Sequence, residues 1–337
     1  MPNGILIVNK PAGWTSQDVA AKLRGVFHEK HVGHGGTLDP MATGVLPIFL
    51  GRATRAVPFF EHADKEYEAV LRLGLVTDTQ DTTGHVLEEH PVDITPEQLE
   101  SVLPAFRGEI QQLPPMYSAI KVNGQKLYAL ARKGKEVVRE PRPVTIYRLE
   151  LLDEATGNWQ QATEIAFPLG GRCPSVNQGT VLNQGTVNQG TVLRLTSQSE
   201  NRPLIDYRLR IHCSKGTYVR TLCHDIGAAL GCGGCMAALV RTRAGRYGIA
   251  QAHTMEEILA APDPAALLLP VDSLFADRPR CTLSEAGERL LRNGAAVPAG
   301  KLAEGEYRVY GPGGDFLALC AAARGELRTV KSFFEPN

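Results

Sequence analysis

The sequence predicts an α+β fold, in which helices pack on a mixed, mainly antiparallel sheet and a small β-rich domain follows. Strand-like and helix-like segments are interspersed without the regular alternation that marks a parallel sheet. Turn signals such as Asn123-Gly124 favour hairpins, and therefore antiparallel neighbours. After about Ala276 the composition shifts to one short helix and several short strands between glycine-containing turns. We therefore expect two domains, over residues 1–275 and 276–337.

Apolar periodicity predicts the elements of the first part of the chain. A short buried strand is stopped by Lys10-Pro11, and a helix capped at Thr15 or Ser16 follows. A second helix begins at Thr95, because proline stands directly after it and glutamine two residues further on. The segments predicted as strands in this part are 5–9, 45–50 and 65–74.

The middle of the chain predicts a hairpin, two long strands and another helix. SAIKVNGQKL (118–127) contains a strand and a turn, and a helix then runs through Arg132-Lys133 to a glycine cap at Gly134. Residues 143–152 and 204–213 alternate in polarity and predict two strands. Residues 217–230 have one apolar face and predict a helix.

A polar insertion at about 154–203 separates those two strands. The tetrapeptide NQGT occurs at 177–180, 183–186 and 188–191, a spacing far too short for a repeat architecture. A glycine-rich polar chain buries too little apolar surface to offset the entropy cost of ordering it. We expect a disordered or loosely paired insertion, with an aggregation-prone β ladder as the alternative.

Composition excludes several classes of protein. No run of about 18 apolar residues is present, and no basic region precedes the first apolar run, so we expect neither a membrane span nor a signal peptide. Seven cysteines, an odd number, favour a reduced cytoplasmic chain over a disulfide scaffold. Cys232 and Cys235 have the spacing of metal ligands, but no second pair of this kind accompanies them. We therefore expect no metal site.

Charge is unevenly distributed, although the formal net charge is zero. The segment from Lys121 to Arg148 has eight Lys/Arg and two Glu, and that from Arg208 to Arg246 has seven Lys/Arg and one Asp. Two such basic blocks in a neutral chain are typical of a surface that contacts a phosphate backbone. An ordinary solvated surface is the alternative.

The stretch GHGGTLDPMATG (33–44) is the leading candidate for a functional loop. Its glycines allow backbone and substrate to approach closely, and Pro40 biases Asp39 toward an extended backbone that points its side chain outward. An Asx turn before proline would explain the same residues without any chemistry. The glycine spacing is not that of a nucleotide-binding loop, and the chain lacks the nucleophile elbow of α/β-hydrolases. A glycosidase would need a second carboxylate, which this loop lacks.

Three distant residues favour a chemical role for the loop. Tyr67 lies near the start of a predicted strand, and Tyr218 and Arg220 lie at a predicted strand-to-helix junction. An arginine beside a carboxylate keeps it ionised and oriented, and tyrosine rings offer stacking faces for a base. Together with Asp39 these residues predict a pocket for a nucleobase that has left its stack.

Five blocks of the sequence then point to one family. They are KPAGWTS (10–16), GHGGTLDPMATGVLPIFLGRATR (33–55), KEYEAVLRLGLVTDTQDTTG (65–84), QLPPMYSAIKVNGQKLYALARKG (112–134) and CSKGTYVRTLCHDIGAALG (213–231). In this order they resemble the bacterial tRNA pseudouridine-55 synthases, the TruB family, over most of residues 4–250. The stretch from about 280 resembles the small RNA-binding domain, related to the PUA domain, of bacterial members. The resemblance implies a bent, mixed, mostly antiparallel sheet.

The resemblance also implies a reaction and a role for each candidate residue. Uridine 55 in the TΨC arm of tRNA is isomerised to pseudouridine: the glycosidic bond to N1 breaks, the base turns, and a bond forms to C5, without cofactor or metal. Asp39 matches the catalytic aspartate, as nucleophile or general base, and Arg220 matches its arginine partner. The other matching positions are Tyr67, which stacks on the target base, His34, which lies beside the flipped nucleotide, and Tyr218 and Leu239, which line the uridine pocket.

The expected partner is the T-arm stem-loop of tRNA, bound by a monomeric cytoplasmic protein that has no membrane association. A non-catalytic tRNA-binding or folding protein on the same scaffold is the alternative, and a base-removing glycosylase would share the pocket. The insertion departs from the family, where the flanking strands are joined far more briefly. Since it leaves and re-enters at strand ends, we expect that deleting about residues 172–200 leaves activity nearly intact.

Overall fold

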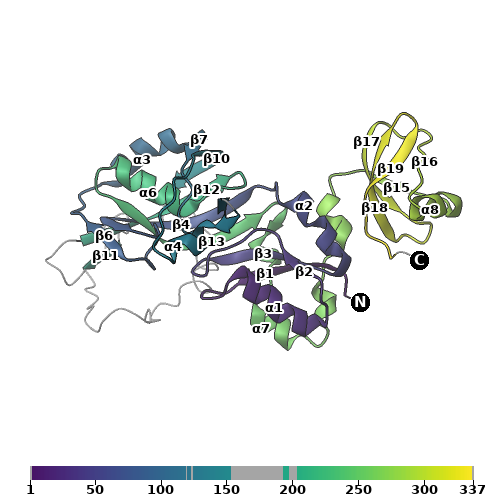
Figure 1. Ribbon diagram of the computed structural model, residues 1–337, viewed down its shortest axis with the longest axis horizontal. Coiled ribbons are helices and arrows are strands. Elements are labelled where there is room, and N and C mark those ends of the chain that lie inside the picture. The colour runs from purple at the N-terminus through teal and green to yellow at the C-terminus, as the bar shows by residue number, and fades with distance from the viewer. Residues whose placement is uncertain (1, 119, 123, 153–192, 197–202, 336–337) are drawn as a thin grey trace.

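The computed structural model describes residues 2–118, 120–122, 124–152, 193–196 and 203–335, and it confirms the predicted α+β fold (Figure 1). Within these residues a ten-stranded sheet forms the body of the molecule, and a separate five-stranded sheet contains the C-terminal strands. Most neighbouring strands of the large sheet are antiparallel, but β3 and β13 run parallel, which makes the sheet mixed. No helix among the described residues is long and apolar enough to cross a membrane.

The large sheet has the order β1-β3-β13-β4-β12-β10-β7, with β2, β11 and β14 paired to its members. Its strands are β1 (Gly4–Lys10), β2 (Val32–His34), β3 (Thr43–Leu50), β4 (Lys65–Leu73), β7 (Gly108–Gln112), β10 (Arg142–Leu151), β11 (Leu193–Thr196), β12 (Pro203–Cys213), β13 (Gly234–Ala244) and β14 (Tyr247–Gly248). Two small hairpins lie beside it: β5 (Leu75–Thr77) with β6 (Val86–Glu89), and β8 (Lys121–Val122) with β9 (Gln125–Lys126).

The predicted strands of the large sheet are confirmed with small changes at their ends. Strands β10 and β12 pair with each other, as do β1 and β3. Most of the predicted insertion and Asn123 of the predicted turn lie outside the described residues. The one described part of the insertion, β11, pairs antiparallel with β12.

Helix starts follow the capping signals of the sequence. Thr15 caps α1 (Ser16–Phe27) and Thr95 caps α3 (Pro96–Val102), each within a reciprocal capping box. The helix predicted through Lys133 is shorter than expected: α4 (Leu127–Ala131) ends first, because the chain turns and the Gly134 amide donates to the Ala131 carbonyl at 2.9 Å. The other α-helices of the described residues are α2 (Val57–Phe60), α6 (Val219–Ala229), α7 (Met255–Ala260) and α8 (Glu285–Arg292).

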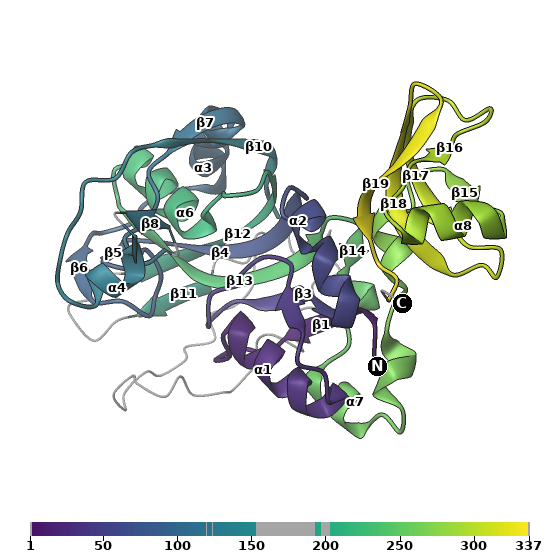
Figure 2. The same ribbon diagram turned by 45° about the vertical axis from the view of Figure 1, so that its right-hand side comes forward.

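The helices pack on the large sheet in two groups. Helices α1 and α7 flank β1 and β2, whereas α3 and α6 pack over β10, β4 and β13 (Figures 1 and 2). One apolar core runs beneath both groups, from Leu6 and Leu23 to Leu209 and Ile226. The Asp39 loop enters β3 and the strand-to-helix junction leaves β12, so both emerge from the body of the sheet.

The C-terminal sheet packs directly against the large one. Its strands are β15 (Arg280–Thr282), β16 (Val297–Pro298), β17 (Gly305–Tyr310), β18 (Phe316–Ala323) and β19 (Glu326–Ser332). Phe275 contacts the rings of Phe316 and Phe333, and a shared apolar cluster continues from there to Ile5 of β1. The Tyr310 hydroxyl donates to Asp272 at 2.5 Å. The shared apolar cluster holds the two sheets together, and the partly buried Tyr310–Asp272 hydrogen bond ties the C-terminal sheet to the segment that leads into it.

Candidate active site

Two buried side chains, those of Lys10 and Ser16 in the block KPAGWTS, hold the loop that carries Asp39. Lys10, which is completely buried, donates to the carbonyls of Pro11 at 2.8 Å, Trp14 at 2.6 Å and Pro40 at 3.2 Å. The Ser16 hydroxyl accepts from the Leu38 amide at 2.8 Å. These bonds fix the residues on both sides of Asp39, so the carboxylate has a defined position on an otherwise slender loop.

Arg241 of β13 anchors the two ends of the same loop. Its guanidinium, 1% exposed, donates to the carbonyl of Val45 at 2.6 Å and to that of Gly36 at 3.2 Å. Gly44 lies against the Arg241 backbone with φ +97°, and a Cβ there would stand 2.3 Å from the Arg241 carbonyl oxygen. Only glycine allows this close approach between β3 and β13.

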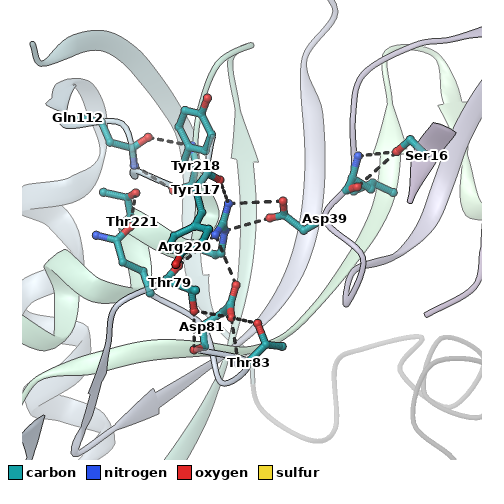
Figure 3. Close-up of polar contacts among 12 residues, drawn as sticks. Ser16, Asp39, Thr79, Asp81, Thr83, Gln112, Tyr117, Tyr218, Arg220 and Thr221 are labelled. Carbon is teal, nitrogen blue, oxygen red and sulfur yellow. Dashed lines mark hydrogen bonds and ion pairs between the residues drawn. The ribbon is translucent and has the colours of Figure 1, made fainter. Parts of the chain in front are cut away.

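The predicted pairing of Asp39 with Arg220 is present. Arg220 Nε lies 3.0 Å from Asp39 Oδ2, and Nη2 lies 3.4 Å from Oδ1 (Figure 3). The same guanidinium donates to the carbonyl oxygens of Thr79 at 3.0 Å and Tyr117 at 2.9 Å. Its side chain is 6% exposed, whereas that of Asp39 is 36% exposed. The arginine is thus a buried anchor, and the carboxylate is the partner that a ligand can reach.

A second carboxylate, Asp81, contacts Arg220 from the other side. Its Oδ2 lies 3.5 Å from Arg220 Nη1. Its Oδ1 accepts from the hydroxyls of Thr79 and Thr83, at 2.8 and 2.5 Å, and from the Thr83 amide at 3.0 Å. With 4% exposure and these partners, Asp81 orients the arginine and is not available to a ligand.

The electrostatics of Asp39 combine opposing effects. Burial raises the pKa of the Asp39 carboxyl, the Arg220 guanidinium lowers it, Asp81 raises it again, and Lys10 lowers it. The net shift is upward from the ordinary value. Such a carboxylate is more basic than a solvated one, which suits a nucleophile or a general base.

Two of the predicted tyrosines lie in the electrostatic field of Asp39. Burial raises the pKa of both the Tyr67 and Tyr218 phenols, and the Asp39 carboxylate raises both further. Tyr67 is 9% exposed on β4, opposite Arg241. Tyr218 immediately precedes α6, as the predicted strand-to-helix junction requires. The structure therefore brings Asp39, Arg220, Tyr67 and Tyr218 together.

His34 and Leu239 lie at the border of this group. His34 ends β2 at the start of the loop, and burial together with Arg241 lowers its pKa, which favours the neutral imidazole. Its Nδ1 is buried and has no hydrogen-bond partner among the described residues. Leu239 lies on strand β13 and packs in the main core at 6% exposure.

Two arginines of the second basic block are buried, and two others pair with glutamates of β4. Arg220 and Arg241 are buried. Arg210 pairs with Glu68 at 3.3 Å, and Arg243 pairs with Glu66 at 2.6 Å. Cross-strand partners in β4 neutralise these charges, because acidic residues of one strand face basic residues of its neighbours.

Sequence reasoning missed several residues that shape the site. Asp81 lies in a turn rich in threonine and aspartate, TDTQDTTG (77–84), whose turn chemistry was the available signal. Lys10 and Ser16 both stand in the first family block, KPAGWTS. Gln112 begins the fourth family block, QLPPMYSAIKVNGQKLYALARKG, whereas Arg241 lies outside all five blocks. Among the described residues no cluster of three metal-ligating side chains occurs.

Comparison with solved structures defines the fold class. The structure titled "Crystal Structure of a Cbf5-Nop10-Gar1 Complex" matches with a TM-score of 0.63 at 22% identity, over 99% of this chain and 85% of that chain. The one titled "Structure of H/ACA RNP bound to a substrate RNA containing 2'-deoxyuridine" matches with a TM-score of 0.63 at 21% identity, over 100% of this chain and 86% of that chain. The chain therefore shares its fold with these two structures.

Sequence comparison identifies the family. A model described as "TruB family pseudouridylate synthase (N terminal domain)" matches residues 24–166, and one described as "tRNA pseudouridylate synthase B C-terminal domain" matches residues 220–276. The tRNA pseudouridine synthase B of Azoarcus sp. (strain BH72) is 40% identical over 328 residues, 97% of this chain and 93% of that protein. That of Syntrophomonas wolfei is 39% identical over 323 residues, 95% of this chain and 93% of that protein. The chain belongs to the TruB family of pseudouridine synthases, as the sequence blocks predicted.

Proposed function

We propose that the protein isomerises uridine 55 in the TΨC arm of tRNA to pseudouridine. The observation that carries the proposal is the accessible Asp39 carboxylate held at 3.0 Å by the buried Arg220 guanidinium. Relatives about 40% identical over nearly the whole chain are named tRNA pseudouridine synthase B, which supports the same reaction and the same class of RNA. A protein that only bound RNA would have no need of an oriented carboxylate facing a phosphate-rich ligand.

In this reaction Asp39 acts on the flipped uridine as nucleophile or as general base. The N1–C1′ bond breaks, the uracil turns, and a C5–C1′ bond forms; the proton leaves C5, and N1 gains one. Arg220 keeps Asp39 oriented through both steps, because Asp81, Thr79 and Tyr117 fix the guanidinium independently of the substrate. No cofactor or metal is needed, since the reaction is an isomerisation without net oxidation.

The surrounding side chains receive the uridine. Tyr67 stacks on the target base, and Tyr218 and Leu239 line the pocket around it. His34, in its neutral form, lies beside the flipped nucleotide, and its unpartnered Nδ1 supports a role in hydrogen bonding to RNA. Aromatic stacking suits a base that must be held after unstacking.

The T-arm backbone binds along the segment between β7 and β10. Lys121, Lys126, Lys133 and Lys135 of this segment are exposed, and the same segment contributes the Tyr117 carbonyl to the site. Residues 276–337 form a second, RNA-binding domain attached to a catalytic domain of residues 1–275. The protein acts as a monomer in the cytoplasm; the free cysteines at six described positions support a reducing compartment.

Tritium release tests the proposal. T-arm RNA tritiated at uridine C5 is incubated with the protein and with the Asp39→Asn variant, and released tritium and free uracil are measured. Release by the parent protein alone supports isomerisation. Release by neither protein would leave a binding function, and free uracil would indicate a glycosylase.

A further inference from the structure

The helix that carries Arg220 begins without a side-chain cap. Threonine side chains cap α1, α3 and α7 within reciprocal capping boxes. The cap of α6 is Tyr218, whose side chain makes no capping hydrogen bond. Local sequence therefore does not fix the first turn of α6, although Arg220 in that turn must meet four separate acceptors.

A residue from the edge of the sheet supplies the missing contacts. The Gln112 side-chain amide donates from Nε2 to the Tyr218 carbonyl at 3.0 Å, and its Oε1 accepts from the Tyr218 amide at 2.8 Å (Figure 3). The pair of bonds resembles one rung of an antiparallel ladder, with a side-chain amide in place of a strand. Because both groups of one planar amide are engaged, they restrict both the distance and the orientation of the Tyr218 backbone.

Gln112 is itself rigidly held. It is 2% exposed and ends β7, where its backbone pairs with Arg142 of β10. The chain that leaves Gln112 reaches Tyr117, whose carbonyl accepts from Arg220 Nη2 at 2.9 Å. Gln112 is thus linked to two segments that contact the Arg220 guanidinium. Its side chain holds the start of α6, and its main chain continues to Tyr117.

We propose that Gln112 is a positioning residue for pseudouridine formation, whose side-chain amide fixes the Tyr218 backbone and so orients Arg220 against Asp39. This inference rests on the proposed function, because its effect is measured on that reaction. It acts after RNA binding: Gln112 is buried beneath Tyr218 and contributes to the placement of the catalytic pair, not to contact with the RNA backbone.

The test compares Gln112→Met with Gln111→Met. Met retains the length of the side chain but can neither donate to nor accept from the Tyr218 backbone as the amide does. Gln111 lies on the same strand and is exposed, so its replacement controls for the chemical change. Single-turnover tritium release and T-arm RNA affinity are measured separately for both variants and for the parent.

We expect Gln112→Met to lower the single-turnover rate constant roughly 10- to 100-fold with unchanged RNA affinity, because small misplacements of catalytic groups have effects of this size. Gln111→Met should match the parent. Equal rates for the two variants, or weaker RNA binding with an unchanged rate, would overturn the inference. An inactive parent protein would refute the proposed function instead.

A measurement on the parent protein covers the case in which Gln112→Met does not fold. Hydrogen exchange of the Tyr218 amide should be slowed to the level of amides within the sheet, because that amide donates to a buried acceptor. Exchange as fast as that of an exposed loop amide would show that the Gln112 contact does not persist in solution, and would also overturn the inference.

Discussion

Replacing Gly44 by alanine should separate β3 from β13 and weaken the whole Asp39 loop. The new Cβ would lie 2.3 Å from the Arg241 carbonyl oxygen and 2.8 Å from its amide nitrogen, both backbone atoms that cannot turn aside. The φ of +97° adds strain, of about 1–3 kcal/mol for a non-glycine residue. Relieving the clash in a packed sheet costs about a further 1–3 kcal/mol. We expect a total loss of roughly 2–6 kcal/mol in the free energy of unfolding.

The matched control is Gly108→Ala in the same sheet. Gly108 has φ +82° and nothing within 4 Å of its hypothetical Cβ, so its variant carries the conformational strain alone. Urea denaturation followed by far-UV circular dichroism measures both variants, and tritium release measures their activity. Equal losses of stability for Gly44→Ala and Gly108→Ala would refute the steric reasoning. Activity retained in Gly44→Ala would show that the contacts of Arg241 with the loop do not govern Asp39.

Three further predictions concern the loop and its charges. Ser16→Ala should lose about 1–3 kcal/mol of stability in urea denaturation, because it leaves the buried Leu38 amide without its acceptor; the exposed Ser101→Ala variant should lose much less, and equal losses would contradict the argument. Asp39→Asn should unfold at higher urea than the parent at neutral pH. The raised pKa means that the native state binds the Asp39 proton more tightly than the unfolded chain, so ionisation lowers stability as pH rises; the difference should vanish in acid, and a parent more stable at neutral pH would refute it. Burial lowers the pKa of Lys10 from 10.5 to about 8. Between these two pH values the unfolded chain binds more protons than the native state, so stability rises with pH over that range. Lys10→Met should lack about 3 kcal/mol of that rise between about pH 7 and pH 11, and an unchanged pH dependence would contradict the prediction.

Local signals predicted much of the fold and part of the site. The caps at Thr15 and Thr95 act within one helical turn, so the sequence alone reveals them. Asp39 was recognisable because glycines and a proline surround it within a few residues. Tyr218 and Arg220 were recognisable because they follow a strand pattern and begin a helix pattern.

The rest depended on contacts between distant segments. Gln112 and Tyr218 are 106 residues apart, and Asp81 and Arg220 are 139 apart, so no local pattern links them. The partners of Arg210 and Arg243 could not be predicted for the same reason, since Glu68 and Glu66 face them only after β4 joins the sheet. The order of the strands in the sheet decides which charged residues face one another, and local composition does not encode that order.

The contacts of Arg220 with four acceptor residues have a consequence for biosynthesis. Asp39 and Arg220 are 181 residues apart, so the carboxylate leaves the ribosome long before the residue that orients it. Until β12 and α6 have emerged, the early strands can fold, but they hold no competent centre. Chains that end before Arg220 therefore lack the partner that orients Asp39, and we expect them not to isomerise uridine, so the onset of activity during translation would report when α6 joins the sheet.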